Sequence, residues 1–458
     1  MPPTEPGGIQ VVTFGCRLNT YESEVMRNRA SEAGLQDAIL VNTCAVTKEA
    51  ERQARQAVRR LRRDNPHSRL IVTGCGAQLD PERWAAMPEV DRVLGNEEKL
   101  QAESYRTPEL AGAAPNTVPA EPGTGTETVV AVSDIMAVTE TAGHLITGFE
   151  ERTRAFLQVQ QGCDHRCTFC IIPFARGNNR SVPMGAVADH AKALVASGYR
   201  ELVLTGVDIT AYGEDLPGRP SLGQMVRRLL RAVPGLERLR LSSLDPVEVD
   251  DDLLRLLKDD PRLLPHVHLS VQAGDDLILK RMKRRHSRAD VIALCDTLRD
   301  ARPDIALGAD IIVGFPTETE EMFQRSLDLV ERCGLTHLHV FPYSPRPGTP
   351  AAKMPQLDKA TIKMRAARLR AKGAEVRAAF TTARIGQTDR LLVERLKPLP
   401  DGRQAALGHG DCFLPLTLPL DPTQPEPEIG SILPVRAMAA QASDATNQPN
   451  ALFVETAR

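Results

Sequence analysis

The sequence lacks the features of a membrane or exported protein. No apolar run approaches the ~18 residues that a membrane-spanning helix needs. The polar start at Met1 to Gly8 has no basic segment leading into an apolar one. We therefore expect a cytoplasmic protein without membrane contact, and its nine cysteines are not expected to form disulfides in a reducing compartment.

A strong excess of charge is also missing. The formal net charge is -2, which excludes a uniformly basic nucleic-acid binder but leaves local basic patches open. The length of 458 residues exceeds what one ordinary core accommodates and predicts two or three domains.

The first hundred residues repeat one unit, in which an apolar, strand-like run ends near a cysteine and a helix-like stretch follows. The runs are VVTFGC, ILVNTC and LIVTGC, and they end at Cys16, Cys44 and Cys75. The spacing suits successive βα units of a parallel sheet, whose strands end at one edge. We expect an amino-terminal parallel α/β domain at 1–106 with its three thiols close together.

A Pro-rich segment follows, and we read 107–149 as a linker. Pro108, Pro115, Pro119 and Pro122 disfavour both helix and central strand there. Beyond it, six strand candidates alternate with helical patterns, beginning at Arg154, Glu201, Leu236, His266, Ala306 and His337. They predict a partial (β/α)6 barrel over 150–385. Short β-like runs over 386–458 predict a small carboxyl-terminal β-barrel.

Three cysteines follow the first strand of the predicted barrel with the spacing C-x3-C-x2-C. Cys163, Cys167 and Cys170 can hold three irons of a [4Fe–4S] cube and leave the fourth iron open to an external ligand. A closed zinc site would need a fourth ligand, and three buried unligated cysteines are the other alternative. Phe169, next to the third cysteine, suits either loop packing or stacking on an adenine ring.

Cys16, Cys44 and Cys75 have no short-range ligand spacing, and each alone reads as a buried residue at a strand end. Their equivalent positions in three repeats favour a second site with three ligands and one open iron. The metal-ligand candidates are therefore Cys16, Cys44, Cys75, Cys163, Cys167 and Cys170.

The C-x3-C-x2-C loop, with an aromatic residue before its last cysteine, resembles the signature of the radical S-adenosylmethionine (SAM) superfamily. The order of three-cysteine domain, barrel and small tail resembles the methylthiotransferase family, whose tail is a TRAM domain. FGCRLN at Phe14, NTCAVT at Asn42, VTGCGAQ at Val72 and GCDHRCTFCIIPFARG at Gly162 look most like the branch that acts on threonylcarbamoyladenosine in tRNA.

This resemblance implies two [4Fe–4S] clusters. It places SAM and Phe169 at the cluster held by Cys163, Cys167 and Cys170, and it implies two SAM molecules per turnover. It implies hydrogen removal from carbon 2 of the adenine at position 37 of tRNA, an external electron donor and a sulfur donor that the sequence does not identify. Related branches modify isopentenyladenosine in tRNA or an aspartate of a ribosomal protein. An iron–sulfur electron carrier or RNA-binding scaffold is the non-enzymatic alternative, although carriers usually ligate all four irons.

Two basic stretches are candidates for RNA contact. Lys48 to Arg63 places its basic residues largely off the apolar face of a predicted helix, and KRMKRRHSR at Lys280 to Arg288 follows a barrel strand. The tail from Gly386 to Arg458 has six basic and nine acidic residues, which is less suited to binding RNA.

Overall fold

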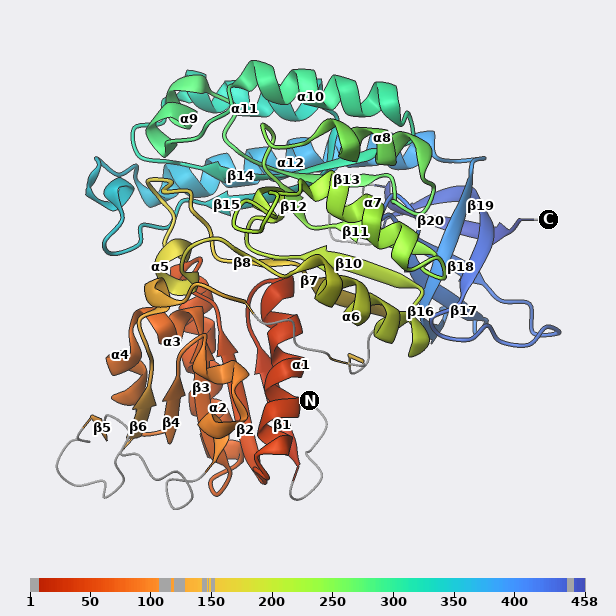
Figure 1. Cartoon of the computed structure of the whole chain (residues 1–458). Coiled ribbons are helices and arrows are strands. Elements are labelled where there is room, and N and C mark those ends of the chain that lie inside the picture. Colours follow the sequence, from red (N-terminus) through yellow and green to blue (C-terminus); the bar gives the residue numbers. More distant parts are fainter. Residues whose placement is uncertain are drawn as a thin grey trace.

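The chain forms three packed bodies in a computed structural model that describes residues 8–106, 117–118, 128–141, 146, 148–149, 153–442 and 449–457. The amino-terminal body lies below the central one, and the carboxyl-terminal barrel lies beside the central body (Figure 1). The prolines Pro108, Pro115, Pro119 and Pro122 fall outside the described residues.

The amino-terminal body is built on a six-stranded sheet with the order β1-β2-β3-β4-β6-β5. Its first three strands carry the predicted repeats and pair in parallel. The strands are β1 (Ile9–Thr13), β2 (Ala38–Thr43), β3 (Arg69–Gly74), β4 (Arg92–Leu94), β5 (Thr117–Val118) and β6 (Thr128–Ala131). The helices are α1 (Arg17–Glu32), α2 (Lys48–Asp64), α3 (Cys75–Leu79) and α4 (Pro81–Ala85), with short 3-10 turns at Glu98–Leu100 and Ala102–Tyr105.

The sheet extends into the segment that we read as a linker. Strand β6 pairs in parallel with β4, so Val93 lies opposite Val130. Partly buried Val130 and Val132 pack against the core of this body, which explains why the chain returns to the sheet. The domain boundaries thus stay a prediction, and part of 107–149 belongs structurally to the first body.

The central body is a partial barrel of parallel strands in two sheets, β11-β10-β7 and β12-β13-β14-β15. All six predicted strands are present, which confirms the expected fold class. They are β7 (Arg154–Gln158), β10 (Glu201–Thr205), β11 (Arg238–Leu241), β13 (His266–Gln272), β14 (Ala306–Val313) and β15 (Leu335–Pro342). Three shorter strands accompany them. Strand β12 is Ser243–Leu244, and β8 (Gln160–Gln161) pairs separately with β9 (Arg180–Ser181).

The chain runs through helices between these strands, and α10 and α11 lie on the side away from the amino-terminal body (Figure 1). The helices are α5 (Ile172–Arg176), α6 (Met184–Ala196), α7 (Leu222–Ala232), α8 (Asp251–Asp259), α9 (Asp276–Met282), α10 (Arg288–Ala301), α11 (Glu320–Arg332) and α12 (Lys359–Ala383). Short 3-10 turns occur at Ile135–Ala137, Ile209–Ala211 and Pro350–Lys353. Within the described residues, no helix is both long and apolar enough to cross a membrane.

The tail forms the expected closed barrel, with the strand order β16-β17-β18-β20-β19. Its strands are β16 (Thr388–Pro398), β17 (Gln404–His409), β18 (Pro415–Pro419), β19 (Ile432–Ala442) and β20 (Pro449–Thr456). The β17–β18 turn inserts Phe413 against the central barrel, where the guanidinium carbons of Arg154 and Arg240 each lie 4.9 Å from the ring centroid.

Buried charges hold this tail at the amino-terminal ends of the central strands. Glu201 forms ion pairs of 2.7 Å with both Arg238 and Arg240, and these arginines donate to the carbonyl oxygen of Gly410. Burial by itself raises the pKa of Glu201, but the two guanidiniums outweigh it and lower the pKa to about 2.

This arrangement predicts an acid-sensitive interface. A carboxyl group with a lowered pKa stabilises the fold above its ordinary pKa of about 4.5, and the contribution is lost as the pH falls toward 2. We expect Glu201→Gln to destabilise the protein by about 3 kcal/mol at pH 7, because it leaves two buried cations unpaired, and to flatten the stability profile below pH 4.5.

Thermal denaturation followed by circular dichroism between pH 7 and pH 3 tests this. Glu331→Gln is the control, because Glu331 pairs with Lys372 at an exposed site and contributes less than about 1 kcal/mol. Equal effects of the two substitutions at pH 7 would contradict the assignment.

Candidate active site between two cysteine trios

The three amino-terminal cysteines meet at one edge of the sheet, as predicted. Cys16 caps α1 three residues beyond β1, after the turn at Gly15, Cys44 follows β2 directly, and Cys75 begins α3 directly after β3. A Cβ atom placed on Gly15 would lie 3.2 Å from the Cys44 sulfur, so the turn packs closely against that thiol. We call Cys16, Cys44 and Cys75 the amino-terminal trio.

Burial favours the neutral thiol at Cys44. It raises the pKa of Cys44 to about 12, and neighbouring Cys75 contributes in the same direction. A bound metal ion reverses this preference, because coordination stabilises the thiolate. Without a metal ion, Cys44 is therefore poorly suited to act as a free thiolate nucleophile.

The second trio, Cys163, Cys167 and Cys170, lies in the loop between β8 and α5. Backbone hydrogen bonds fix this loop, among them Cys163 N–H to Gly177 O (3.1 Å) and Cys170 N–H to Cys167 O (3.1 Å). Burial raises the pKa of Cys170 to about 12. We call these residues the loop trio.

His165, inside the loop, points to other partners. Its Nε2 lies 3.0 Å from Asp208 Oδ2 and 3.7 Å from Glu248 Oε1. Hydrogen bonds to these two carboxylates raise the pKa of His165 to about 10, although burial opposes the shift. The His165 ring is therefore engaged with two carboxylates and is not directed to the three cysteines.

The spacing of the sulfurs separates a cube from a single metal ion. Within the described residues, the sets of three ligand atoms within 4.8 Å of one another are His268–Asp310–His339 and His165–Asp245–Glu248, and neither trio is among them. A tetrahedral zinc with bonds of about 2.3 Å would hold its sulfurs closer together than that. Neither trio therefore has the sulfur spacing of a preformed zinc site, whereas thiolates on three corners of an iron–sulfur cube lie farther apart.

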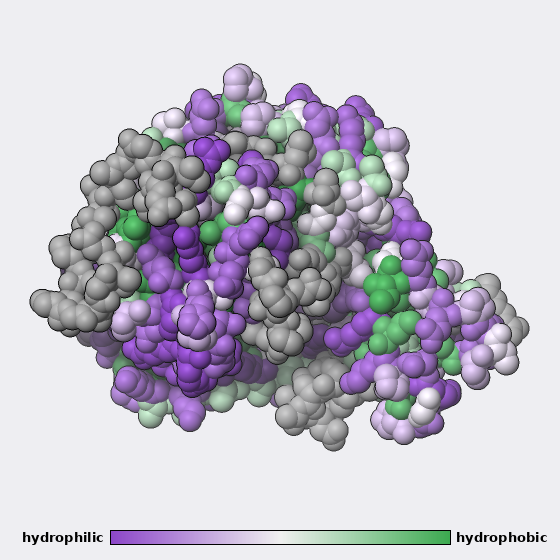
Figure 2. Space-filling view, turned by 90° about the horizontal axis from the view of Figure 1, so that it is seen from below, coloured by the Kyte–Doolittle hydropathy of each residue, from purple (hydrophilic) through white to green (hydrophobic). Residues whose placement is uncertain are grey.

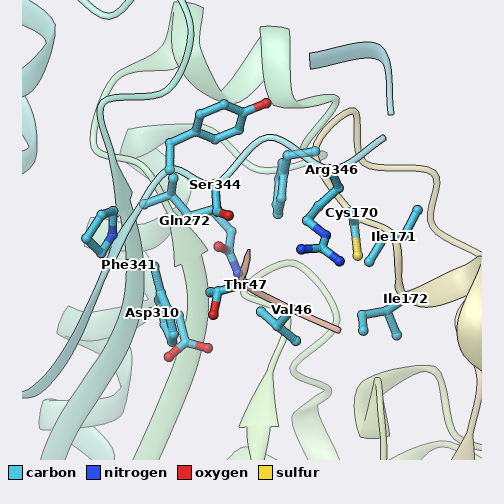
Figure 3. Close-up of a pocket in the computed structure, with 14 residues that line it drawn as sticks. Val46, Thr47, Cys170, Ile171, Ile172, Gln272, Asp310, Phe341, Ser344 and Arg346 are labelled. Atoms are coloured by element: carbon cyan, nitrogen blue, oxygen red, sulfur yellow. The ribbon is translucent and has the colours of Figure 1, made fainter. Parts of the chain in front are cut away.

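A cavity of about 170 Å³ is lined by Cys170 of the loop trio and by residues next to the amino-terminal trio. Val46 and Thr47, which follow Cys44, line it from the amino-terminal body, and Cys170 lines it from the central body (Figure 3). Phe169 is also in its wall. The remaining wall comes from the carboxyl-terminal ends of strands β13, β14 and β15, where barrels of this kind carry their chemistry. Asp310 in this wall is hydrogen-bonded to His268 (2.8 Å) and His339 (3.0 Å).

Phe169, for which the sequence suggested loop packing or stacking on an adenine ring, packs in the loop and also lines the cavity. It is partly buried against the apolar cluster that includes Met282 and Phe315, and it also faces the cavity. Stacking on an adenine ring stays a prediction.

Three arginines near the cavity were not singled out from the sequence. The Arg176 Nε lies 3.1 Å from the Cys75 sulfur, and the Arg284 Nη1 lies 3.6 Å from the Cys167 sulfur. Arg346 lines the cavity itself. No periodicity or spacing marks these residues, because each reaches a cysteine or a cavity wall that is distant in sequence.

The basic stretches differ in how their charge is used. Helix α2 buries Ala54, Val58 and Leu61 as predicted and exposes Arg59 and Arg63. The amino-terminal body, which carries α2, has a mostly hydrophilic surface when the molecule is viewed from below (Figure 2).

The stretch from Lys280 to Arg288 is largely engaged within the protein, which reduces the charge that it offers to RNA. Arg284 pairs with Asp245 at 2.8 Å, and Arg285 and Arg288 pair with Glu248 and Asp328.

Two parts of the chain match known protein families. Residues 157–330 match the Radical SAM superfamily, and residues 8–95 match the Uncharacterized protein family UPF0004. The chain is 49% identical, over 89% of its length and 91% of the relative's, to the threonylcarbamoyladenosine tRNA methylthiotransferase MtaB of Rickettsia prowazekii.

More distant relatives share the architecture. The MtaB protein of Thermotoga maritima is 38% identical over 84% of this chain and 86% of its own. The tRNA-2-methylthio-N(6)-dimethylallyladenosine synthase of Sphingopyxis alaskensis is 36% identical over 86% of this chain and 88% of its own. The fold is similar to that of the radical SAM methyltransferase TsrM of Kitasatospora setae, with a TM-score of 0.55, 16% identity and coverage of 76% and 74% of the two chains.

The turn before Cys75 yields a prediction about the amino-terminal trio. Gly74 has φ +96°, and a Cβ atom there would lie 2.4 Å from Thr43 O, the carbonyl adjacent to Cys44. We expect Gly74→Ala to displace Cys75 relative to Cys44, to destabilise the protein by more than about 2 kcal/mol and to reduce iron binding at this trio.

Gly34→Ala is the matched control, because Gly34 also has positive φ (+73°) but nothing within 4 Å of its added Cβ. Iron content after anaerobic reconstitution and the thermal midpoint are the measurements. A full iron content in Gly74→Ala would show that the close approach at this turn does not set the site.

Proposed function

The chain belongs to the radical SAM methylthiotransferase family, and we propose on this premise that it converts N(6)-threonylcarbamoyladenosine at position 37 of tRNA to its 2-methylthio derivative. Two observations support the proposal. Two cysteine trios lie on bodies that are docked through Arg176, which hydrogen-bonds to the Cys75 sulfur, and the relative with 49% identity is named for its action on threonylcarbamoyladenosine in tRNA.

The two trios support the proposed chemistry, because each provides three thiols, whereas an electron carrier would usually ligate every iron. Two sites with an open iron are what a reaction between a small-molecule cofactor and a sulfur species requires. We assign one [4Fe–4S] cluster to Cys16, Cys44 and Cys75 and another to Cys163, Cys167 and Cys170.

When bound, the loop-trio cluster supplies the electron that cleaves SAM, and the amino-terminal cluster supplies the site from which sulfur is transferred. The chain itself contributes placement and exclusion of water. Phe169, Gln272 and Ile312 offer apolar and amide contacts to an adenine ring. Val46 and Thr47 line the cavity from the amino-terminal body, close in sequence to Cys44.

Arg346 gives the cavity a charge that distinguishes among substrates. The residue is 5% exposed, is paired with Glu51 and points into the cavity (Figure 3). Its Nε and Nη1 atoms are buried and find no hydrogen-bond acceptor among the described residues. Buried donors of this kind favour a ligand with paired acceptor oxygens, such as a carboxylate.

A threonylcarbamoyl group carries a carboxylate, whereas a dimethylallyl group is an uncharged hydrocarbon. We therefore propose that Arg346 binds the carboxylate of the threonyl group. The reaction also needs tRNA as its substrate, an external electron donor and a sulfur donor, and we place it in the cytoplasm.

Nucleoside mass analysis of tRNA tests the proposed function. We expect a deletion strain to lose 2-methylthio-threonylcarbamoyladenosine and the wild-type gene to restore it, while genes carrying Cys44→Ala or Cys170→Ala do not. Cys412→Ala, in the core of the carboxyl-terminal barrel, is the control and should restore the product. Loss of the dimethylallyl counterpart instead, or of a ribosomal-protein modification with tRNA intact, would overturn the substrate assignment.

The purified protein should also hold about eight irons after anaerobic reconstitution, and replacing either complete trio by alanine should leave about four. Bound zinc, or an iron content that is insensitive to the amino-terminal trio, would contradict the assignment of ligands.

The role of Arg346 predicts a substrate-selective defect. Arg346→Gln should lower kcat/KM for threonylcarbamoylated tRNA at least about tenfold, because it removes a charged hydrogen bond that contributes at least about 1.4 kcal/mol. Arg346→Lys keeps the charge and should retain part of the activity. SAM binding and SAM cleavage without tRNA should not change. If cleavage without tRNA falls equally, the arginine binds the carboxylate of SAM rather than that of the nucleoside.

A further inference from the structure

Arg176 belongs to the central body but ends inside the amino-terminal one. It is the last residue of α5, six positions after Cys170, and 2% of it is exposed. Helix α5 lies directly above α3, which begins with Cys75 (Figure 1). The arginine therefore links the loop trio to the amino-terminal trio.

All five N–H donors of the guanidinium are used. The Nε donates to the Cys75 sulfur at 3.1 Å, and the two terminal nitrogens donate to Gln161 (2.9 Å), Asn19 (2.5 Å) and both carboxylate oxygens of Glu22. A fork with every donor occupied has a fixed orientation. The guanidinium therefore holds its hydrogen bond to the Cys75 sulfur in a fixed geometry.

Lys99 completes a buried cluster of charges with Arg176 and Glu22. The Lys99 ammonium lies 2.7 Å from Glu22 Oε2 and 2.7 Å from Asn96 Oδ1, and the Lys99 and Glu22 side chains are fully buried. Two cations and one anion leave one positive charge. Burying an uncompensated charge is costly, so this cluster requires a negative partner nearby.

A cluster bound by the amino-terminal trio has the required charge. An oxidised [4Fe–4S] core carries two positive charges and three thiolates bring three negative ones, so the unit is singly negative. Neutral thiols would leave the positive charge unbalanced. Arg176, Lys99 and Glu22 together therefore match the charge of a cube held by Cys16, Cys44 and Cys75.

We propose that Arg176 is a positioning residue of the amino-terminal iron–sulfur site, whose guanidinium balances the charge of the cluster and raises its reduction potential. Net charge and hydrogen bonds to sulfur set the potentials of such clusters, and reduction adds negative charge that a fixed cation stabilises. Because the cation comes from the central body, the complete site exists only when the two bodies are docked. The inference rests on the proposed function, because it needs a cluster at this trio.

Redox titration of the amino-terminal cluster, followed by electron paramagnetic resonance of the full chain, tests the proposal. The titration uses protein in which Cys163, Cys167 and Cys170 are replaced by alanine, so that one cluster is observed. We expect Arg176→Gln to lower the reduced-to-oxidised ratio at a fixed potential at least about tenfold, which is 59 mV for a one-electron couple. Arg176→Lys, which keeps the charge, should restore most of the difference.

A second pair of variants tests the charge balance without touching the arginine. Lys99→Met removes one positive charge and should lower the ratio in the same direction as Arg176→Gln. Adding Glu22→Gln to Lys99→Met returns the sum to one positive charge, so the double variant should recover toward the wild-type ratio. A purely structural role predicts the opposite, because the double variant loses more contacts than the single one.

The outcomes separate this inference from the proposed function. If the wild-type trio holds no iron, the ligand assignment fails and the inference fails with it. If the cluster is present but its potential is the same in Arg176→Gln and Lys99→Met, or if the double variant departs further than Lys99→Met alone, only the inference is overturned.

Discussion

The buried ion pair between Glu22 and Arg176 is the interaction on which the arrangement of the site depends. Glu22 lies on α1 of the amino-terminal body, Arg176 ends α5 of the central body, and neither charge reaches solvent. Since an isolated buried charge is strongly unfavourable, the two bodies must dock for the pair to be satisfied. Docking brings the loop after β8 against the edge of the sheet that carries Cys16, Cys44 and Cys75.

Around this pair, polar contacts fix the relative position of the two trios. Asn96 of the amino-terminal body donates to Ala175 O of α5 at 2.7 Å and to the Cys75 sulfur at 4.0 Å. Farther along the interface, Lys48 N–H donates to Ser344 Oγ at 3.2 Å, close to the pair formed by Glu51 and Arg346. The cavity is therefore a property of the interface, since neither body encloses it alone.

The carboxyl-terminal barrel acts at the opposite end of the central strands. Glu201, Arg238 and His266 are first residues of their strands, whereas the cavity is lined by residues near the ends of β13, β14 and β15. Phe413 closes this lower end between two guanidiniums. The tail packs against this end of the central strands, and none of its described residues lines the cavity, which fits a sequence with more acidic than basic residues in this region.

Much of the fold could be predicted from the sequence because strand periodicity and repeated spacing are local properties. The three βα units ending at Cys16, Cys44 and Cys75, the six central strands and the C-x3-C-x2-C loop all follow from residues that are neighbours in the chain, and parallel pairing alone brings the first three thiols to one edge. The family resemblance likewise rests on short motifs.

The contacts between residues far apart in the chain were decided only by the tertiary structure. Arg176 meets Cys75 across 101 positions, and Arg284 meets Cys167 across 117. The stretch from Lys280 to Arg288 reads as a free basic patch in the sequence, yet folding pairs most of its arginines internally. The return of β6 to the first sheet is also decided by packing. Local patterns specify which elements form, but the charge and polarity of each trio's surroundings depend on which elements meet, and this is set by the docking of the bodies.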